Sequence, residues 1–136
     1  MKRIVIALLA TAGMAGAAVA QAMTPGVTAS DQDVSGGSVM AESVTAPEKG
    51  WLVVHRTDAE MKPGPVVGHA PLNEGMNENV SAELTEDVAS GDMLMLMVHS
   101  EAGGNEMGVF EYTLGAKEDG PIRVGGELVT ATITAD

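Results

Sequence analysis

The chain has 136 residues, no cysteine and a formal charge of −12. This charge argues against nucleic-acid binding, which depends on Lys and Arg side chains that neutralise phosphates, and against docking on anionic lipid. Without cysteine, neither a disulfide nor a blue copper site can form, so packing alone must stabilise the fold.

The N-terminal segment has the three parts of a secretory signal peptide. Lys2 and Arg3 precede an apolar stretch that ends in Ala-Val-Ala at residues 18–20. We predict that residues 1–20 are a signal peptide, cleaved at the end of this range or two residues later; an uncleaved N-terminal anchor is the alternative. The mature chain, periplasmic or extracellular and not inserted in a membrane, would keep five basic and 19 acidic residues, a formal charge of −14.

The mature chain is predicted to have a short lead-in and one domain. Residues 21–37 are mostly Thr, Ser, Gly, Asp and Gln, which is typical of a flexible segment. From 38 to 136, short apolar runs alternate with Gly, Pro and Asn turns, and no helical period is visible. The predicted strands are 38–44, 51–56, 66–69, 79–84, 93–99, 109–114, 122–124 and 127–134.

Seven or eight short strands indicate an all-β fold, an immunoglobulin-like antiparallel β-sandwich. Two short segments carry turn signals. Gly125-Gly126 is expected to close a hairpin. Ser90-Gly91-Asp92 precedes the most apolar run of the mature chain, residues 93–99. A parallel sheet is not expected, because its crossover helices are absent from the pattern.

Several segments, in this order, resemble a family of small secreted domains of unknown function. They are Trp51-Leu52-Val53-Val54-His55, Val66-Val67-Gly68-His69, Asn73-Glu74-Gly75, Leu94-Met95-Leu96-Met97-Val98-His99 and Asp119-Gly120-Pro121. The family occurs in cell-surface and exported proteins of haloarchaea and in exported bacterial proteins. The resemblance implies an immunoglobulin-type sandwich in extracellular proteins but no activity, and it makes His55, His69 and His99 the counterparts of recurrent histidines.

A row of methionines ending in a histidine is the main chemical lead. Because alternate side chains of a strand share a face, Met93, Met95, Met97 and His99 are expected opposite a core face of Leu94, Leu96 and Val98. Thioether and imidazole ligands suit the cuprous ion. His55 and His69 would complete the candidate metal ligands if their strands lie beside this one. The alternative is that these methionines fill an irregular core.

We expect a non-enzymatic exported module that binds an unidentified protein or surface polymer, without a cofactor. No nucleophile elbow or phosphate-binding loop is present. The alternative is a periplasmic copper(I)-binding or copper-handling protein that uses the Met/His face. A metal-dependent hydrolase is a third hypothesis, which needs an open coordination site and a nearby carboxylate.

Overall fold

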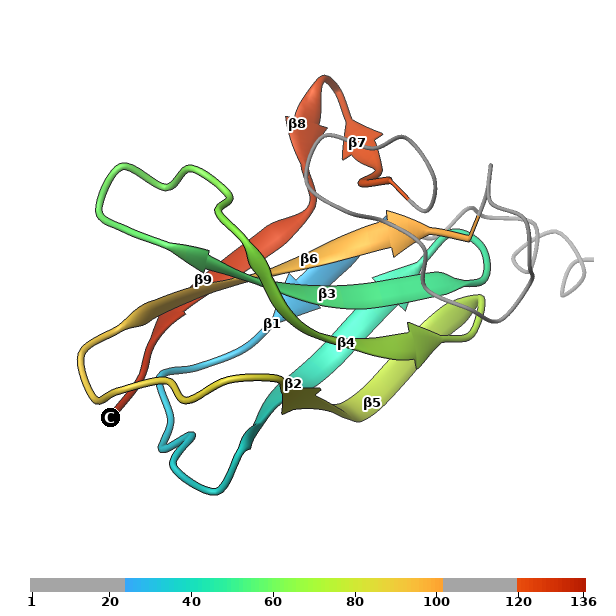
Figure 1. Cartoon of the computed structure of the whole chain (residues 1–136). Coiled ribbons are helices and arrows are strands. Elements are labelled where there is room, and N and C mark those ends of the chain that lie inside the picture. The colour runs from blue at the N-terminus through green and yellow to red at the C-terminus, as the bar shows by residue number, and fades with distance from the viewer. Residues whose placement is uncertain (1–23, 102–119) are drawn as a thin grey trace, which may run out of the picture.

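The computed structural model describes residues 24–101 and 120–136, and every regular element in these ranges is a β-strand (Figure 1). No helix in these ranges has the length and apolar character needed to cross a membrane. The strands are β1 (Gly26–Thr28), β2 (Ser38–Ala46), β3 (Gly50–Thr57), β4 (Val66–Leu72), β5 (Gly75–Leu84), β6 (Met93–Ser100), β7 (Arg123–Val124), β8 (Glu127–Leu128) and β9 (Thr130–Thr134).

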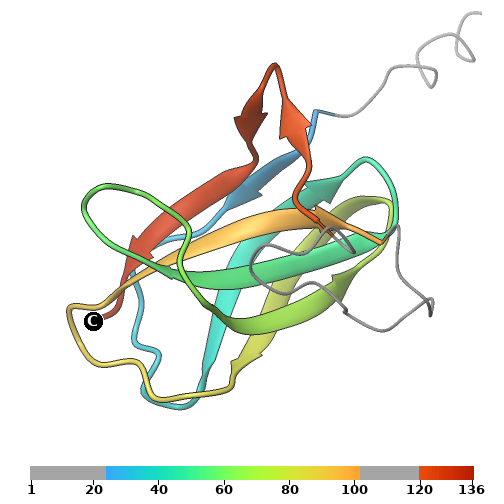
Figure 2. The same cartoon turned by 45° about the horizontal axis from the view of Figure 1, so that its top comes forward.

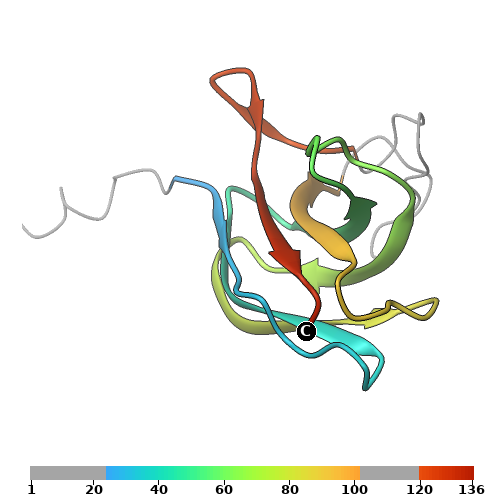
Figure 3. The ribbon, with the colours of Figure 1, turned by 90° about the vertical axis from the view of Figure 1, so that its left-hand side faces the viewer.

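One antiparallel sheet makes both layers of the molecule. Its strand order is β1-β2-β5-β4-β3-β6-β9, and β7 and β8 form a separate hairpin. The sheet curls at the β4–β5 junction, where only Gly68–Leu84 and His69–Glu83 are paired, so that β1, β2 and β5 face β3, β6 and β9 (Figure 3). This arrangement follows the strand order of an immunoglobulin-type sandwich. The predicted all-β, antiparallel fold class is confirmed.

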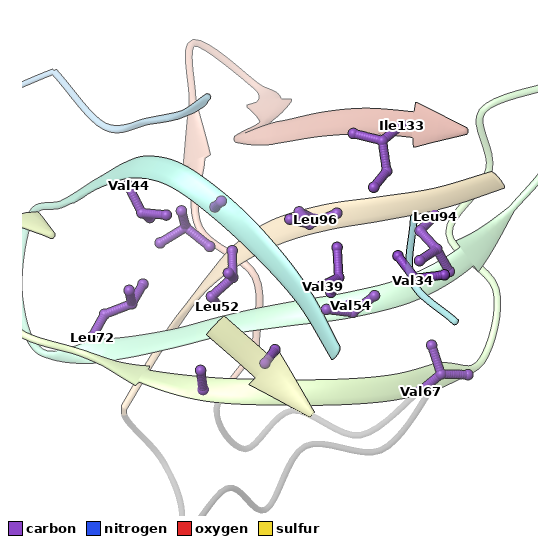
Figure 4. Close-up of a cluster of buried hydrophobic side chains, with 14 of the residues drawn as sticks. Val34, Val39, Val44, Leu52, Val54, Val67, Leu72, Leu94, Leu96 and Ile133 are labelled. Carbon is purple, nitrogen blue, oxygen red and sulfur yellow. The ribbon is translucent and has the colours of Figure 1, made fainter. Parts of the chain in front are cut away.

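The core lies between the two layers and is built from aliphatic side chains (Figure 4). Leu94, Leu96 and Val98 of β6 point into it, as the alternation along residues 93–99 predicts. The largest fully buried aliphatic side chains of the core are Leu52, Leu94, Leu96, Ile133, Val39, Val44, Val54 and Val67. Neither Met95 nor Met97 belongs to this cluster, although both are buried, so β6 is covered on both of its faces.

The described part of the predicted lead-in 21–37, residues 24–37, differs from the flexible segment that its composition suggested. From Gly26 onward it belongs to the fold: β1 pairs with β2, and Val34 is buried in the core. The Gln32 side chain completes the attachment, because its Nε2 donates to the Met40 carbonyl and its Oε1 accepts from the Met40 N–H. A polar segment is therefore held by hydrogen bonds, which hydrophobic patterning does not reveal.

The hairpin predicted at Gly125-Gly126 is present and projects from the sheet (Figure 2). Both glycines have positive φ, as a two-residue type I′ turn requires. The strand predicted over 127–134 is broken at Val129, where the chain leaves the hairpin and joins the edge of β6. The predicted strand 109–114 and the signal peptide 1–20 lie outside the described residues.

Candidate functional site

The outer face of β3 and β6, the face opposite the core, carries the residues of chemical interest. Alternation places Trp51, Val53 and His55 of β3 there, beside Met95, Met97 and His99 of β6. All six side chains are buried; His55 is 1% exposed and His99 is not exposed at all. Histidine is seldom fully buried unless its ring nitrogens are hydrogen-bonded or bound to a metal.

The register between β3 and β6 orders these residues in rows across the sheet. Trp51 lies opposite His99, Val53 opposite Met97 and His55 opposite Met95. Residues 93 and 99 are six positions apart, about 20 Å along a strand. The whole Met/His row therefore cannot surround one ion, and Met93, only half-buried, lies at the far end of β6 opposite Thr57.

Two of the three histidines meet on this face. His55 and His99 lean toward each other along the strands, and their Nε2 atoms are 3.4 Å apart. The ring centroids are 5.5 Å apart and the ring planes are tilted by 32°. Met97 and Val53 occupy the row between their two rows.

A backbone carbonyl fixes the protonation pattern of His55. Its Nδ1 lies 2.9 Å from the carbonyl oxygen of Gly64, in the loop between β3 and β4. A carbonyl can only accept, so Nδ1 carries the proton and the Nε2 of a neutral ring presents its lone pair toward His99. Burial lowers the pKa of His55 from its ordinary value of 6.5, against the weaker opposing effect of the Gly64 hydrogen bond, so the neutral form is favoured.

The third histidine lies elsewhere. His69, on β4, packs edge-on against Trp51, with ring centroids 5.4 Å apart, and its pKa is lowered by desolvation. The convergence predicted for the histidines thus occurs for His55 but not for His69. Among the described residues, no group of three or more His, Cys, Asp or Glu side chains is placed to hold a metal ion. The histidine pair has the thioethers of Met95 and Met97 in the rows beside it.

A recess of about 580 Å³ opens beside Trp51, at the end of the sheet where β3 begins and β4 ends. Its size falls within the usual range for ligand pockets, about 300–1,000 Å³. Three of its eight lining residues, Lys49, Asn73 and Glu101, lie outside the strands, and the sequence pattern alone did not single them out as a site. The lining residues are Lys49, Gly50, Trp51, His69, Pro71, Leu72, Asn73 and Glu101.

A second hollow, of about 380 Å³, lies over the other end of the outer face. Thioether and hydroxyl side chains dominate its wall, with the β7–β8 hairpin on one side. The lining residues are Met61, Met95, Arg123, Glu127, Leu128, Thr130 and Thr132. Because Met95 lies directly opposite His55, this hollow reaches the neighbourhood of the histidine pair from the surface.

The fold and these two regions define a small antiparallel β-sandwich with a ligand-sized recess and a buried histidine pair. The chain belongs to the family described as a domain of unknown function (DUF7282), whose model matches residues 25–136. The predicted resemblance to a secreted family of haloarchaeal surface proteins is confirmed.

Two proteins of Haloarcula hispanica are similar to most of the chain. Cell surface glycoprotein 2 is 30% identical over 113 residues, and cell surface glycoprotein 1 is 28% identical over the same length. The aligned part covers 82% of this chain but only 11% of either glycoprotein. The chain therefore spans about a tenth of the length of these relatives. No solved structure matches it.

Proposed function

We propose that the protein is an exported, non-enzymatic module of the cell envelope that binds an envelope component. Its relatives are named as cell surface glycoproteins, and the aligned region is a small part of each. This proportion is typical of a module that is combined with other domains in long surface proteins. The basic start, apolar stretch and small-residue exit of residues 1–20 support export of this chain.

The recess beside Trp51 is the observation that carries the binding role. It combines an aromatic wall from Trp51 and His69 with charged groups from Lys49 and Glu101, and a few convergent polar groups in an apolar hollow are typical of binding sites. Trp51 is only 5% exposed. It therefore forms the floor of the recess, and the ligand contacts come from the exposed residues around it, such as Asn73 and Pro71.

Sedimentation with isolated cell envelopes tests this function. The mature protein should pellet with envelopes of its own host in a saturable manner, and Lys49→Glu should weaken the binding because it reverses a charge at the rim of the recess. Lys62→Glu is the matched control, since Lys62 is an exposed lysine in the loop at the opposite end of β3.

Pretreatment of the envelopes identifies the class of ligand. Loss of binding after protease digestion would assign a protein partner, and loss after removal of polysaccharide would assign a surface polymer. Equal sedimentation of the parent and the Lys49→Glu variant would show that the recess is not the binding surface. A chain that stays in the cytoplasm on fractionation of the host would contradict the export that the proposal requires.

A further inference from the structure

We propose that His55 and His99 form a binding site for one cuprous ion, with the thioether of Met97 as a third donor. This site lies on the buried outer face of β3 and β6 and does not depend on the envelope role proposed above. It uses three of the six candidate ligands from the sequence. Met93 lies too far along β6 to take part, and His69, on β4, lies too far across the sheet.

The spacing of the two imidazoles fits a shared metal ion. Nitrogens 3.4 Å apart, each at the usual metal–imidazole distance of about 2.0 Å, subtend an angle of about 115° at the ion. This angle is close to that of trigonal coordination, which leaves one direction for a third ligand. For a direct N–H···N hydrogen bond, by contrast, 3.4 Å is long.

The hydrogen bond from His55 to Gly64 provides the support that metal-binding histidines usually have. A ligating histidine almost always donates its second ring N–H to a carbonyl or carboxylate, which fixes the ring orientation and the tautomer. His55 has this arrangement, with Nδ1 at 2.9 Å from the Gly64 oxygen and Nε2 directed at His99.

The surroundings select a soft, monovalent ion. Zinc usually takes four ligands from Cys, His, Asp and Glu, whereas the rows of β6 beside the pair carry the thioethers of Met95 and Met97. Thioethers prefer Cu(I). Met97 is 1% exposed and occupies the row between those of the two histidines, and Met95 lies opposite His55.

The hollow on the outer face supplies a route for the ion. Met61 and Met95 line it, Met61 is 51% exposed and Met95 is 4% exposed. The thioether of Met61 at the surface and that of Met95 opposite His55 would offer the ion soft ligands at both ends of the hollow, whose wall also includes the carboxylate of Glu127. Sulfur at the entrance also favours Cu(I) over the harder divalent ions of the medium.

A competition titration of the mature protein with Cu(I) against a chromogenic cuprous chelator tests the site. We expect one ion per chain, and affinity reduced by at least about 100-fold in His55→Gln and in His99→Gln, more than the 10- to 100-fold typical of outer-shell changes. His69→Gln is the matched control, because it removes a histidine outside the pair, and it should bind as the parent does. Met97→Leu should weaken binding and keep the fold.

Two measurements on the unmutated protein apply even if a histidine variant fails to fold. One equivalent of Cu(I) should raise the melting temperature, because the ion binds only the folded chain. X-ray absorption should show two nitrogen neighbours and at least one sulfur neighbour. Binding that is unchanged in the folded histidine variants, coordination without nitrogen, or no binding by the parent would each overturn the proposal and leave a hydrogen-bonded histidine pair.

Discussion

Arg56 joins β3 to the loop that precedes β6. Its guanidinium donates to Glu86 at 3.0 Å, to Asp92 at 3.2 Å and to the carbonyl oxygen of Asp87 at 2.7 Å. The contact with Glu86, and after it the contact with Asp92, raises the pKa of Arg56 against the opposing effect of burial. Three acceptors on one planar group restrict the loop geometrically, although exposed ion pairs contribute little energy individually.

The Asp92 carboxylate is expected to make stability depend on acid pH. Its pKa is lowered from the ordinary 3.8, first by the backbone N–H of Ala89 and then by Arg56. Because the folded state holds this proton less tightly than the unfolded chain, the stabilisation is complete at neutral pH and is lost as the pH falls below about 4. Asp92→Asn should therefore melt at a lower temperature than the parent at pH 7.

The difference in melting temperature between Asp92→Asn and the parent should become smaller as the pH falls. Thermal denaturation across a pH series measures this difference. Asp58→Asn, at another surface turn, serves as the comparison variant. The difference in melting temperature between Asp92→Asn and the parent could instead stay constant from pH 7 to acid pH. That result would show that the amide disturbs the turn sterically and that the charge is unimportant.

The residue pattern correctly predicted which side chains of β6 lie on the outer face, but it did not predict which residues of that face meet. Alternation along 93–99 separates the leucines from Met95, Met97 and His99, because strand geometry fixes which side chains share a face. The meeting of His55 with His99 depends on the register between strands 44 residues apart. It also depends on the loop that brings the Gly64 carbonyl to His55, and neither feature is encoded locally.

At the scale of the strands, Gly50 sets how closely β3 approaches β6. It opens β3 opposite Ser100, and a Cβ atom built on it would clash with the carbonyl oxygen of His99. Since the obstacle is backbone, no side-chain rotation can relieve it. The glycine therefore permits the close packing of the two strands that carry the histidine pair.

Gly50→Ala should destabilise the protein by about 1–3 kcal/mol, the usual cost of overpacking. Gly36→Ala is the matched control, because a Cβ there meets open space and the residue has an ordinary φ. Chemical denaturation of both variants gives the comparison. If the two alanine variants were equally stable, β3 and β6 would have to separate more easily than their pairing implies.

The first strand is expected to be necessary for full stability. Deletion of the chain up to Gly36 would remove β1 and the buried Val34, together with the hydrogen bonds between Gln32 and Met40. We expect a clearly lower melting temperature in differential scanning calorimetry, whereas a chain that begins at Thr24 should melt as the longer chain does. Equal melting of both truncated chains would restore the interpretation of 21–37 as a lead-in.

Elements with strong apolar alternation were predictable, and elements held by polar contacts were not. The strands from β2 to β6 were each expected within a few residues of their observed bounds, because half-buried strands display their period. β1 has little apolar content and escaped prediction. The last strand was expected to run unbroken to Thr134, but it is interrupted at Val129, between β8 and β9. The Val129 carbonyl accepts a hydrogen bond from the Val98 N–H, and there the chain passes from the β7–β8 hairpin to the edge of β6.

The whole molecule carries a large excess of negative charge, −12 for the full chain. A compact state with this charge is destabilised by self-repulsion. Salt shortens the range of the repulsion, to about 10 Å at 0.1 M and about 3 Å at 1 M. The protein should therefore become more stable as the salt concentration rises.

Thermal melting in sodium chloride from about 0.1 to 1 M tests this expectation, because screening is nearly complete at the upper end. The melting temperature should rise across the series. In a second variant, Glu42, Glu78 and Glu83, which are exposed on β2 and β5, are changed to Gln. This variant should have a higher melting temperature than the parent at low salt, and its melting temperature should rise less across the series. Identical salt responses in the parent and this variant would assign the effect to salt-enhanced burial of apolar groups.

The segment around Gln32 runs parallel to the C-terminal residues and lies beside them. Gln32 and Ala135 form a parallel bridge, the Asp136 N–H donates to the Gln32 carbonyl, and the Thr134 N–H donates to the Asp31 carboxylate. The described part of the chain begins at one end of the molecule, and its C-terminus lies at the other (Figure 2). Tension applied through the two ends would pull these segments past each other and load all of their hydrogen bonds at once. We therefore expect this arrangement to resist traction along the length of the domain.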